Sequence, residues 1–159
     1  MKSSKTVLLA TAIASFALIG VALYLQLVLN MLPCPWCVVQ RYIFIDIGVI
    51  ALVSAFFPAN KMKFGTGLGL LSSLSGVGVA AWHVWIQAHP SVSCGIDPLE
   101  TSLNTFFTAK LLPTLFFANG ECTAEYPPIL GMTVPQCALL WFVIFTLVFA
   151  WLTFKVKSK

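Results

Sequence analysis

The sequence predicts an all-α membrane protein, a bundle of four transmembrane helices with a long second outer loop that carries a short interfacial helix. Composition is the first observation behind this fold class. Apolar residues make up 59% of the 159 residues and charged residues 9%, against about 45–50% and about 25% in soluble domains. So few charges could not cover a water-facing surface, which excludes a soluble enzyme and a nucleic-acid binder that uses a basic patch.

The second observation is the length of the apolar stretches, since about 20 helical residues cross a bilayer core. Four stretches are long enough, and they are continuous rather than alternating, which disfavours a β-barrel. The third stretch contains Gly65/Gly69 and Ser72/Gly76, a spacing that lets helices approach closely in lipid. We expect one integral membrane domain over residues 1–159, with transmembrane helices at about 7–29, 38–57, 64–86 and 134–154 and outer loops at about 30–37 and 87–133.

The first stretch has an alternative interpretation as a cleaved signal peptide, because Lys2 and Lys5 precede it. Its apolar run is longer than the ~7–15 residues of a signal h-region, and no small-residue cleavage site closes it. We therefore expect a membrane anchor that is not cleaved.

The basic residues predict the orientation of the bundle. Seven of the nine fall on one side when the helices are threaded through the membrane: Lys2, Lys5, Lys61, Lys63, Lys155, Lys157 and Lys159. The other side has Lys110 against four acidic residues. Because basic loops stay in the cytoplasm, both termini are expected there.

All five cysteines fall outside the segments expected in the cytoplasm. They are Cys34 and Cys37 in the short first outer loop, Cys94 and Cys122 in the long second loop, and Cys137 at the start of the last helix. Outside the cytoplasm, thiols that approach each other tend to oxidise. Two pairs and one remaining cysteine is the simplest arrangement.

The Cys34-Pro-Trp-Cys37 motif has the spacing of a redox-active pair, because two cysteines three residues apart can close a small disulfide ring. A helix that starts there supplies free N–H groups and a positive dipole that stabilise a thiolate. Arg41 lies one helical turn after Cys37, where its permanent charge adds to this effect. The alternative for Arg41 is a residue that snorkels to the interface.

Two other interpretations of the cysteines remain open. Structural disulfides are one, although a two-residue loop between cysteines constrains little of the unfolded chain. Zinc is the other, although a closed zinc site usually pairs two short-spaced doublets, and 27 residues separate Cys94 from Cys122.

The second outer loop contains a helix signal. Asp97, Pro98 and Glu100 indicate a helix start, and Pro113 ends the pattern before it could span a membrane. An interfacial helix on the outer leaflet is expected, with a buried loop helix as the alternative. Residues at helical spacing follow the start: Leu99, Leu103, Phe106, Phe107 and Lys110.

His83 is expected near the outer end of the third helix, at a depth similar to that of Arg41. Together with Trp82 and Trp85 it could equally belong to an aromatic belt at the interface. Asp46, deeper than Arg41 and off its face, is expected to make a polar contact in the bundle interior.

With these residues in place, the chain resembles the disulfide bond formation protein B (DsbB) family of bacterial inner-membrane thiol oxidases. The resemblance covers nearly the whole chain: four helices, Cys34-Pro-Trp-Cys37 with Arg41 four residues on, and the long loop with Cys94 and Cys122.

The resemblance implies a thiol:quinone oxidoreductase that reoxidises a periplasmic DsbA-like thioredoxin-fold oxidase. It implies catalytic disulfides Cys34–Cys37 and Cys94–Cys122, a mixed disulfide through Cys94, and a transient bridge between Cys34 and Cys122. Cys37, next to Arg41, would pass the electrons to a membrane quinone, either ubiquinone or menaquinone. His83 is a further candidate quinone contact.

No metal and no nucleic acid are expected to bind, and the membrane partners are the lipid bilayer and its quinone pool. Two other functions remain open. One is a metal-binding or transport protein that uses thiolates with His83 or His89, and the other is a structural tetraspanning protein whose outer loop is only stapled by disulfides.

Overall fold

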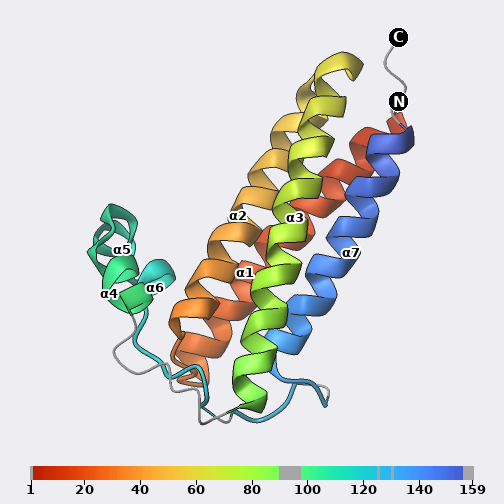
Figure 1. The fold of residues 1–159 in the computed structure, drawn as a ribbon. Helices are drawn as coiled ribbons and strands as arrows, with labels where there is room; N and C mark the ends of the chain where they lie inside the picture. The colour runs from red at the N-terminus through yellow and green to blue at the C-terminus, as the bar shows by residue number, and fades with distance from the viewer. Residues whose placement is uncertain (1, 90–97, 125, 130, 156–159) are drawn as a thin grey trace.

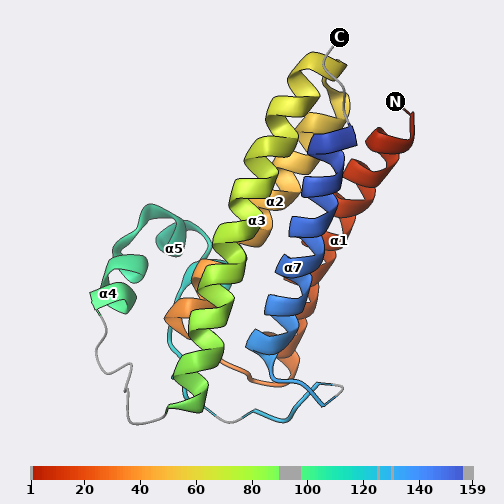
Figure 2. The same cartoon turned by 45° about the vertical axis from the view of Figure 1, so that its right-hand side comes forward.

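Four long helices stand side by side in the computed structural model (Figure 1, Figure 2). The structure describes residues 2–89, 98–124, 126–129 and 131–155. Each long helix is long and apolar enough to cross a membrane: α1 (Lys2–Val28), α2 (Pro35–Phe56), α3 (Ala59–Ala88) and α7 (Val134–Lys155). No strand is present in these described ranges, so the predicted all-α membrane fold is confirmed.

Proline and a cysteine cap set the ends of α2. Pro35 occupies the first turn, where its missing N–H is not needed, and Cys34 caps the helix by accepting a hydrogen bond from the Cys37 N–H. Phe57 leaves the helix with φ −80° and ψ 156°. This extended backbone is favoured directly before a proline, here Pro58, and it separates α2 from α3.

The bundle packs in chain order, with α1 against α2, α2 against α3 and α3 against α7. Phe44 of α2 stacks on Phe142 of α7 with 4.2 Å between the ring centroids, so the buried core crosses the bundle. All four long helices contribute to this core, which includes Leu8 and Ile19 of α1, Ile47 of α2, Met62 and Ala80 of α3, and Phe149 and Leu152 of α7.

Glycines of α3 allow the close packing that their spacing predicts. A Cβ atom on Gly69 would lie 2.3 Å from the ring of Phe149, and one on Gly65 would lie 2.0 Å from the hydroxyl of Ser54. Because both distances are shorter than any normal contact, side chains larger than glycine would push these helices apart.

The prediction that Asp46 lies in the bundle interior is wrong. Its side chain is exposed on the outer surface of α2, where the hydroxyl of Ser72 on α3 donates a 2.5 Å hydrogen bond to Oδ2. The next residue, Ile47, is fully buried, so the inward face of α2 begins one position later. Sequence position gives the depth of a residue in the membrane but not the rotation of its helix.

The described part of the loop between α3 and α7 contains three short helices where the sequence predicts one: α4 (Pro98–Thr105), α5 (Phe107–Leu111) and α6 (Pro113–Phe116). Phe106 interrupts the pattern with extended backbone, φ −63° and ψ 144°. Leu112 makes the second break because it precedes Pro113. Asp97, the first residue of the predicted helix start, lies outside the described residues.

These short helices lie beside α2 rather than across the bundle (Figure 1). Ala109 and Phe116 are buried in a small apolar cluster with Val38 of α2, while Phe106 is 64% and Phe107 71% exposed. Exposed aromatic side chains on a short helical segment favour the interfacial interpretation over a buried loop helix. Contact of this segment with lipid stays a prediction.

Gly69 and Gly67 offer a matched test of the α3–α7 contact. We expect Gly69→Ala to lower the free energy of unfolding by about 1–3 kcal/mol, because its Cβ collides with Phe149. Gly67→Ala meets nothing within 4 Å and should instead gain up to about 1 kcal/mol of helix propensity. Reversible unfolding in detergent measures both variants. Equal stability of the two would show that α3 and α7 do not pack this closely.

Candidate redox site

The Cys34–Cys37 motif forms the first turn of α2. The two Sγ atoms lie 3.2 Å apart as thiols, and the Cys34 sulfur also accepts a 3.4 Å hydrogen bond from the Cys37 N–H. A disulfide needs an S–S distance of about 2.05 Å, so a small side-chain rotation would close the ring. The helix start thus places both sulfurs where the redox interpretation requires them.

Backbone hydrogen bonds dock the long loop against the residues before α2. The carbonyl of Pro33 accepts hydrogen bonds from the N–H groups of Asn119 at 3.1 Å and Gly120 at 3.0 Å. A Cβ atom on Gly120 would lie 2.3 Å from the carbonyl oxygen of Leu32, so only glycine permits this approach. Two residues later the chain reaches Cys122, which is buried against the start of α2.

Cys34 contacts both other described site cysteines, Cys37 and Cys122. The hydrogen bond with Cys122, then that with Cys37, and then burial raise the pKa of Cys34 well above its ordinary value. Both Cys34 and Cys122 are 2% exposed, which keeps bulk water away from their sulfurs. The structure brings together three of the four predicted catalytic cysteines, and Cys94 lies outside the described residues.

Arg41 is buried and hydrogen-bonded on two sides. Its Nη1 donates to Oε1 of Gln26 on α1 at 2.8 Å and to the carbonyl of Leu115 in the loop at 3.0 Å. A snorkelling arginine would carry its charge to water, whereas Arg41 is only 6% exposed. Its charge acts on Cys37, one turn earlier on α2. The geometry therefore favours a site arginine over a snorkelling residue.

His83 points into the site rather than out of the bundle. It is 1% exposed, while Trp82 and Trp85 are 47% and 42% exposed and stack on each other with ring centroids 5.0 Å apart. These tryptophans are suited to an interfacial belt, and His83 is not part of it. Its Nε2 lies 3.5 Å from Cys34 Sγ, and its Nδ1 lies 3.2 Å from Nε2 of Gln40.

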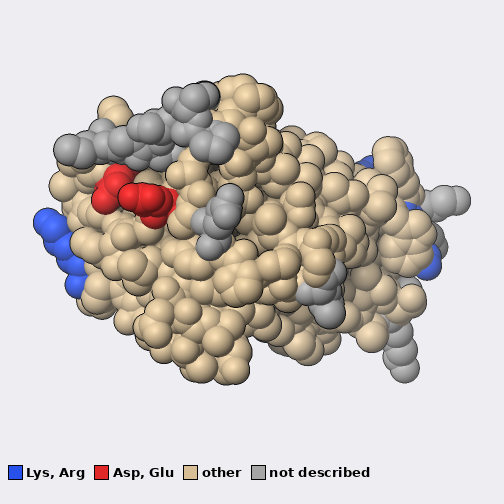
Figure 3. Space-filling model, turned by 90° about the horizontal axis from the view of Figure 1, so that it is seen from below, with Lys and Arg blue, Asp and Glu red and all other residues tan. Residues whose placement is uncertain are grey.

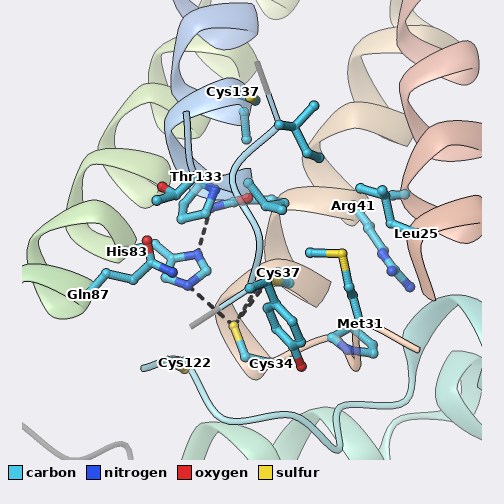
Figure 4. A pocket seen from close by; sticks show the side chains of 18 of the residues that line it. Leu25, Met31, Cys34, Cys37, Arg41, His83, Gln87, Cys122, Thr133 and Cys137 are labelled. Atoms are coloured by element: carbon cyan, nitrogen blue, oxygen red, sulfur yellow. Dashed lines mark hydrogen bonds between the residues drawn. The ribbon is translucent and has the colours of Figure 1, made fainter. Parts of the chain in front are cut away.

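A cavity of about 700 Å³ connects these residues (Figure 4). This volume is within the ~300–1,000 Å³ typical of sites for small organic ligands. Its polar wall contains the sulfurs of Cys34 and Cys37 and the guanidinium of Arg41. The rest of the wall is largely apolar and includes Leu18, Ile19, Leu25, Phe44 and Trp141.

The sulfurs of Cys34 and Cys37 and a ring nitrogen of His83 lie within 4.8 Å of one another. Thiolate and imidazole are the ligands that zinc prefers, so this cluster fits a soft metal ion as well as disulfide chemistry. The fifth cysteine, Cys137, is half-buried at the start of α7 and lines the same cavity (Figure 4).

Two glutamines of the site are not predicted from the sequence. Gln26 is the only strongly polar side chain of the first apolar stretch, which is a signal in itself, but its partner Arg41 lies on another helix. Gln40 directly precedes Arg41, yet it is 4% exposed and faces His83 of α3 instead.

Taken together, the buried thiols, the arginine and the apolar cavity define a class of protein, the membrane-embedded thiol–disulfide oxidoreductases. Residues 4–152 match the family model described as "Disulfide bond formation protein DsbB". The chain therefore belongs to the DsbB family, and its activity as a membrane disulfide oxidoreductase in disulfide bond formation is confirmed.

Relatives named disulfide bond formation protein B cover most of the chain. The protein of Herminiimonas arsenicoxydans is 57% identical over 158 residues, which are 99% of this chain and 100% of the relative. That of Cupriavidus metallidurans is 47% identical over 148 residues, 93% of this chain and 91% of the relative. "Disulfide bond formation protein B 1" of Pseudomonas syringae pv. syringae is 44% identical over 146 residues, which are 91% of this chain and 86% of the relative.

Gly120 provides a test of the loop docking. We expect Gly120→Ala to lower the yield of a Cys34–Cys122 bridge, because the new methyl group meets the Leu32 carbonyl and displaces the loop. The reduced protein is mildly oxidised and its disulfides are mapped by mass spectrometry. Gly78→Ala, which meets nothing within 4 Å, is the control. An unchanged bridge yield in Gly120→Ala would contradict the role of this contact.

Proposed function

We propose that this protein reoxidises a periplasmic DsbA-like dithiol oxidase and passes the electrons to a quinone of the bacterial inner membrane, ubiquinone or menaquinone. One observation carries the proposal. The sulfurs of Cys122, Cys34 and Cys37 follow one another from the loop to the wall of an apolar cavity, where Arg41 supplies a buried positive charge.

Charge supports an orientation with both termini in the cytoplasm. Lys5, Lys61, Lys63 and Lys155 lie toward the end of the bundle that holds the termini and the α2–α3 turn (Figure 1). Figure 3 looks onto the opposite end, where acidic side chains gather on a mostly uncharged surface. The excess of lysine at one end fits the positive-inside rule and leaves the cysteines on the periplasmic side.

The proposed relay begins at the loop disulfide. The thiolate of the partner attacks Cys94, which forms a mixed disulfide and releases Cys122 as a thiolate. Cys122 attacks Cys34, so that the Cys34–Cys122 bond forms, the Cys34–Cys37 bond breaks and the electron pair moves to Cys37. The second thiol of the partner then releases Cys94, which attacks Cys122, restores the loop disulfide and leaves Cys34 reduced.

A quinone in the cavity would accept the two electrons and two protons that are released when the Cys34–Cys37 disulfide forms again. The apolar wall suits its ring and tail, and the cavity volume is sufficient. Arg41 presents five N–H donors, and within the described residues its hydrogen bonds to Gln26 and to the loop carbonyls all come from Nη1. The remaining donors can stabilise negative charge on a quinone oxygen.

The decisive experiment is quinone reduction by the purified protein, driven by a reduced DsbA-like partner and followed by quinone absorbance. We expect turnover that stops when the partner is oxidised beforehand. The proposal would be refuted if the mixture of reduced partner and purified protein reduced neither ubiquinone nor menaquinone. This result would leave the structural tetraspanning interpretation, in which the cysteines only staple the loop.

The cluster of Cys34, Cys37 and His83 favours metal binding as a second candidate function. Metal analysis of the purified reduced and oxidised protein separates it from the relay. In the relay, the Cys34–Cys37 disulfide of the oxidised protein removes two of the three metal ligands, so the oxidised form cannot hold the ion. One metal ion per chain in both forms would therefore support the metal-binding candidate.

Cys94 separates the two halves of the relay. We expect Cys94→Ala to abolish electron transfer from the DsbA-like partner, because the partner has no loop disulfide to attack. Quinone should still oxidise Cys34 and Cys37 after chemical reduction of the variant. Single-turnover assays measure each half-reaction separately, and transfer from the partner at the parent rate would show that the order of the relay is wrong.

Arg41 tests the quinone step. We expect Arg41→Ala to raise the quinone requirement roughly ten- to a hundredfold, because a charge-assisted hydrogen bond contributes about 1.5–3 kcal/mol. Arg41→Lys should recover only part of this, since an ammonium cannot reproduce the planar fork. Exchange between the partner and the loop disulfide should be nearly intact.

Gln26→Leu serves as the control for Arg41, because it removes a hydrogen-bond partner on α1 but keeps the charge. Its effect on the quinone requirement should be smaller than that of Arg41→Ala. Steady-state kinetics with varied quinone decide the matter. An unchanged quinone dependence in Arg41→Ala would leave Arg41 as a tether of the loop alone.

A further inference from the structure

His83 contacts two side chains through its two ring nitrogens. One is Gln40 of α2, and the other is Cys34, which caps that helix. Nε2 lies 3.5 Å from the Cys34 sulfur, and Nδ1 lies 3.2 Å from the amide nitrogen of Gln40 (Figure 4). His83 is 1% and Gln40 4% exposed, so neither side chain has bulk water as an alternative partner.

The chemistry of the glutamine amide decides where the histidine proton lies. The Gln40 amide nitrogen can only donate a hydrogen bond, so the Nδ1 that faces it must present a lone pair. A neutral imidazole carries one proton, which must then be on Nε2. Nε2 faces the Cys34 sulfur, while the ring also hydrogen-bonds the backbone of Cys122, and the sulfur becomes the stronger acceptor for the ring proton once it is a thiolate.

Cys34 needs such a donor more than the other cysteines of the site. Whenever the bond between Cys34 and Cys122 breaks, the electron pair can return to the Cys34 sulfur. Cys34 is 2% exposed, so bulk water cannot stabilise a bare thiolate there. The Cys37 N–H at the helix start donates a 3.4 Å hydrogen bond to the Cys34 sulfur, and the N–H of His83 would add a second donor.

We propose that His83 is a catalytic hydrogen-bond donor to the Cys34 thiolate, and that Gln40 is the positioning residue that fixes its tautomer. This inference rests on the relay proposed above and deepens it. An incoming thiolate attacks Cys122 in a Cys34–Cys122 bridge and forms a new disulfide with it. The old bond breaks, the electron pair goes to Cys34, and the N–H of His83 stabilises the charge without giving up its proton.

The test uses the full chain with Cys34 as its only cysteine, the other four being replaced by serine, and follows alkylation of Cys34 against pH by mass spectrometry. We expect His83→Ala to raise the midpoint by roughly one to two pH units, the effect of losing one hydrogen bond to a charged group. His83→Gln should recover part of this, because its amide can donate. An unchanged midpoint in both variants would overturn the proposal.

Gln40 distinguishes tautomer control from simple packing. In Gln40→Glu, an ionised carboxylate faces Nδ1 of His83 and can only accept a hydrogen bond, so Nδ1 must carry the ring proton. The Nε2 of a neutral His83 then presents a lone pair, rather than an N–H, to Cys34. We expect the alkylation profile to acquire a second step from ionisation of His83. Gln40→Leu should raise the midpoint without that step, and Ser75→Ala, on the outer face of α3, should change nothing. Parent-like profiles in both Gln40 variants would remove Gln40 from the proposal.

Apart from the carboxylate that Gln40→Glu introduces, the charged groups near Cys34 are the same in all these chains, so the comparison of Gln40→Leu with the parent does not depend on them. A chain with one cysteine performs no exchange, so the titration does not depend on the partner or the quinone. Failure of quinone reduction and failure of this inference are thus separate results. In the described part of the chain, the titratable side chains that line the cavity besides the cysteines are Arg41 of α2, His83 of α3, and Glu121 and Tyr126 of the loop, and none of them belongs to α1.

Discussion

The carbonyl oxygen of Pro33 joins the two outer segments of the protein, because it accepts hydrogen bonds from both Asn119 and Gly120. Without this contact Cys122 would have no fixed position, since the chain around it forms no regular helix. Thiol exchange requires sulfurs that approach within bonding distance in line, so the docking of the loop comes before all of the chemistry. The site is therefore built on backbone groups and on a glycine that leaves room for them.

Arg41 provides the second link between the loop and the bundle. A buried guanidinium is costly unless it is hydrogen-bonded, and here its Nη1 donates to Gln26 and to the loop carbonyl of Leu115. The same charge lies one turn from Cys37 and on the cavity wall. Arg41 thus contributes to loop docking as well as to the electrostatics of the electron acceptor site, which couples the loop to the cavity.

Much of this architecture could be predicted from the sequence, because the bilayer imposes strong local rules. Apolar length predicts the four long helices, and Cys-Pro-Trp-Cys predicts the helix start at Pro35, where Cys34 is the cap. Pro113 predicts the break at Leu112. Each of these features depends on residues that are neighbours along the chain, so spacing alone carries the information.

The remaining features depend on contacts between distant segments, which one sequence cannot supply. Gln26 and Gln40 are polar residues whose partners lie on other elements, and Asp46 turned outward because the rotation of α2 is set by packing. Asn104 is a similar case: its side chain pairs with both backbone groups of Ala118 at 2.8 Å and folds the short helices back toward the site.

Cys34 is the point at which these separate constraints meet, since its sulfur contacts Cys37, Cys122 and His83. In disulfide exchange the thiol that holds negative charge more easily leaves faster. When a thiolate attacks Cys34 in the Cys34–Cys37 disulfide, the electron pair goes to the leaving sulfur of Cys37, on which the charge of Arg41 acts. A relay through Cys34 therefore runs toward the cavity by default. The N–H of His83, held against Cys34 together with the Cys37 N–H, favours the release of that sulfur from Cys122.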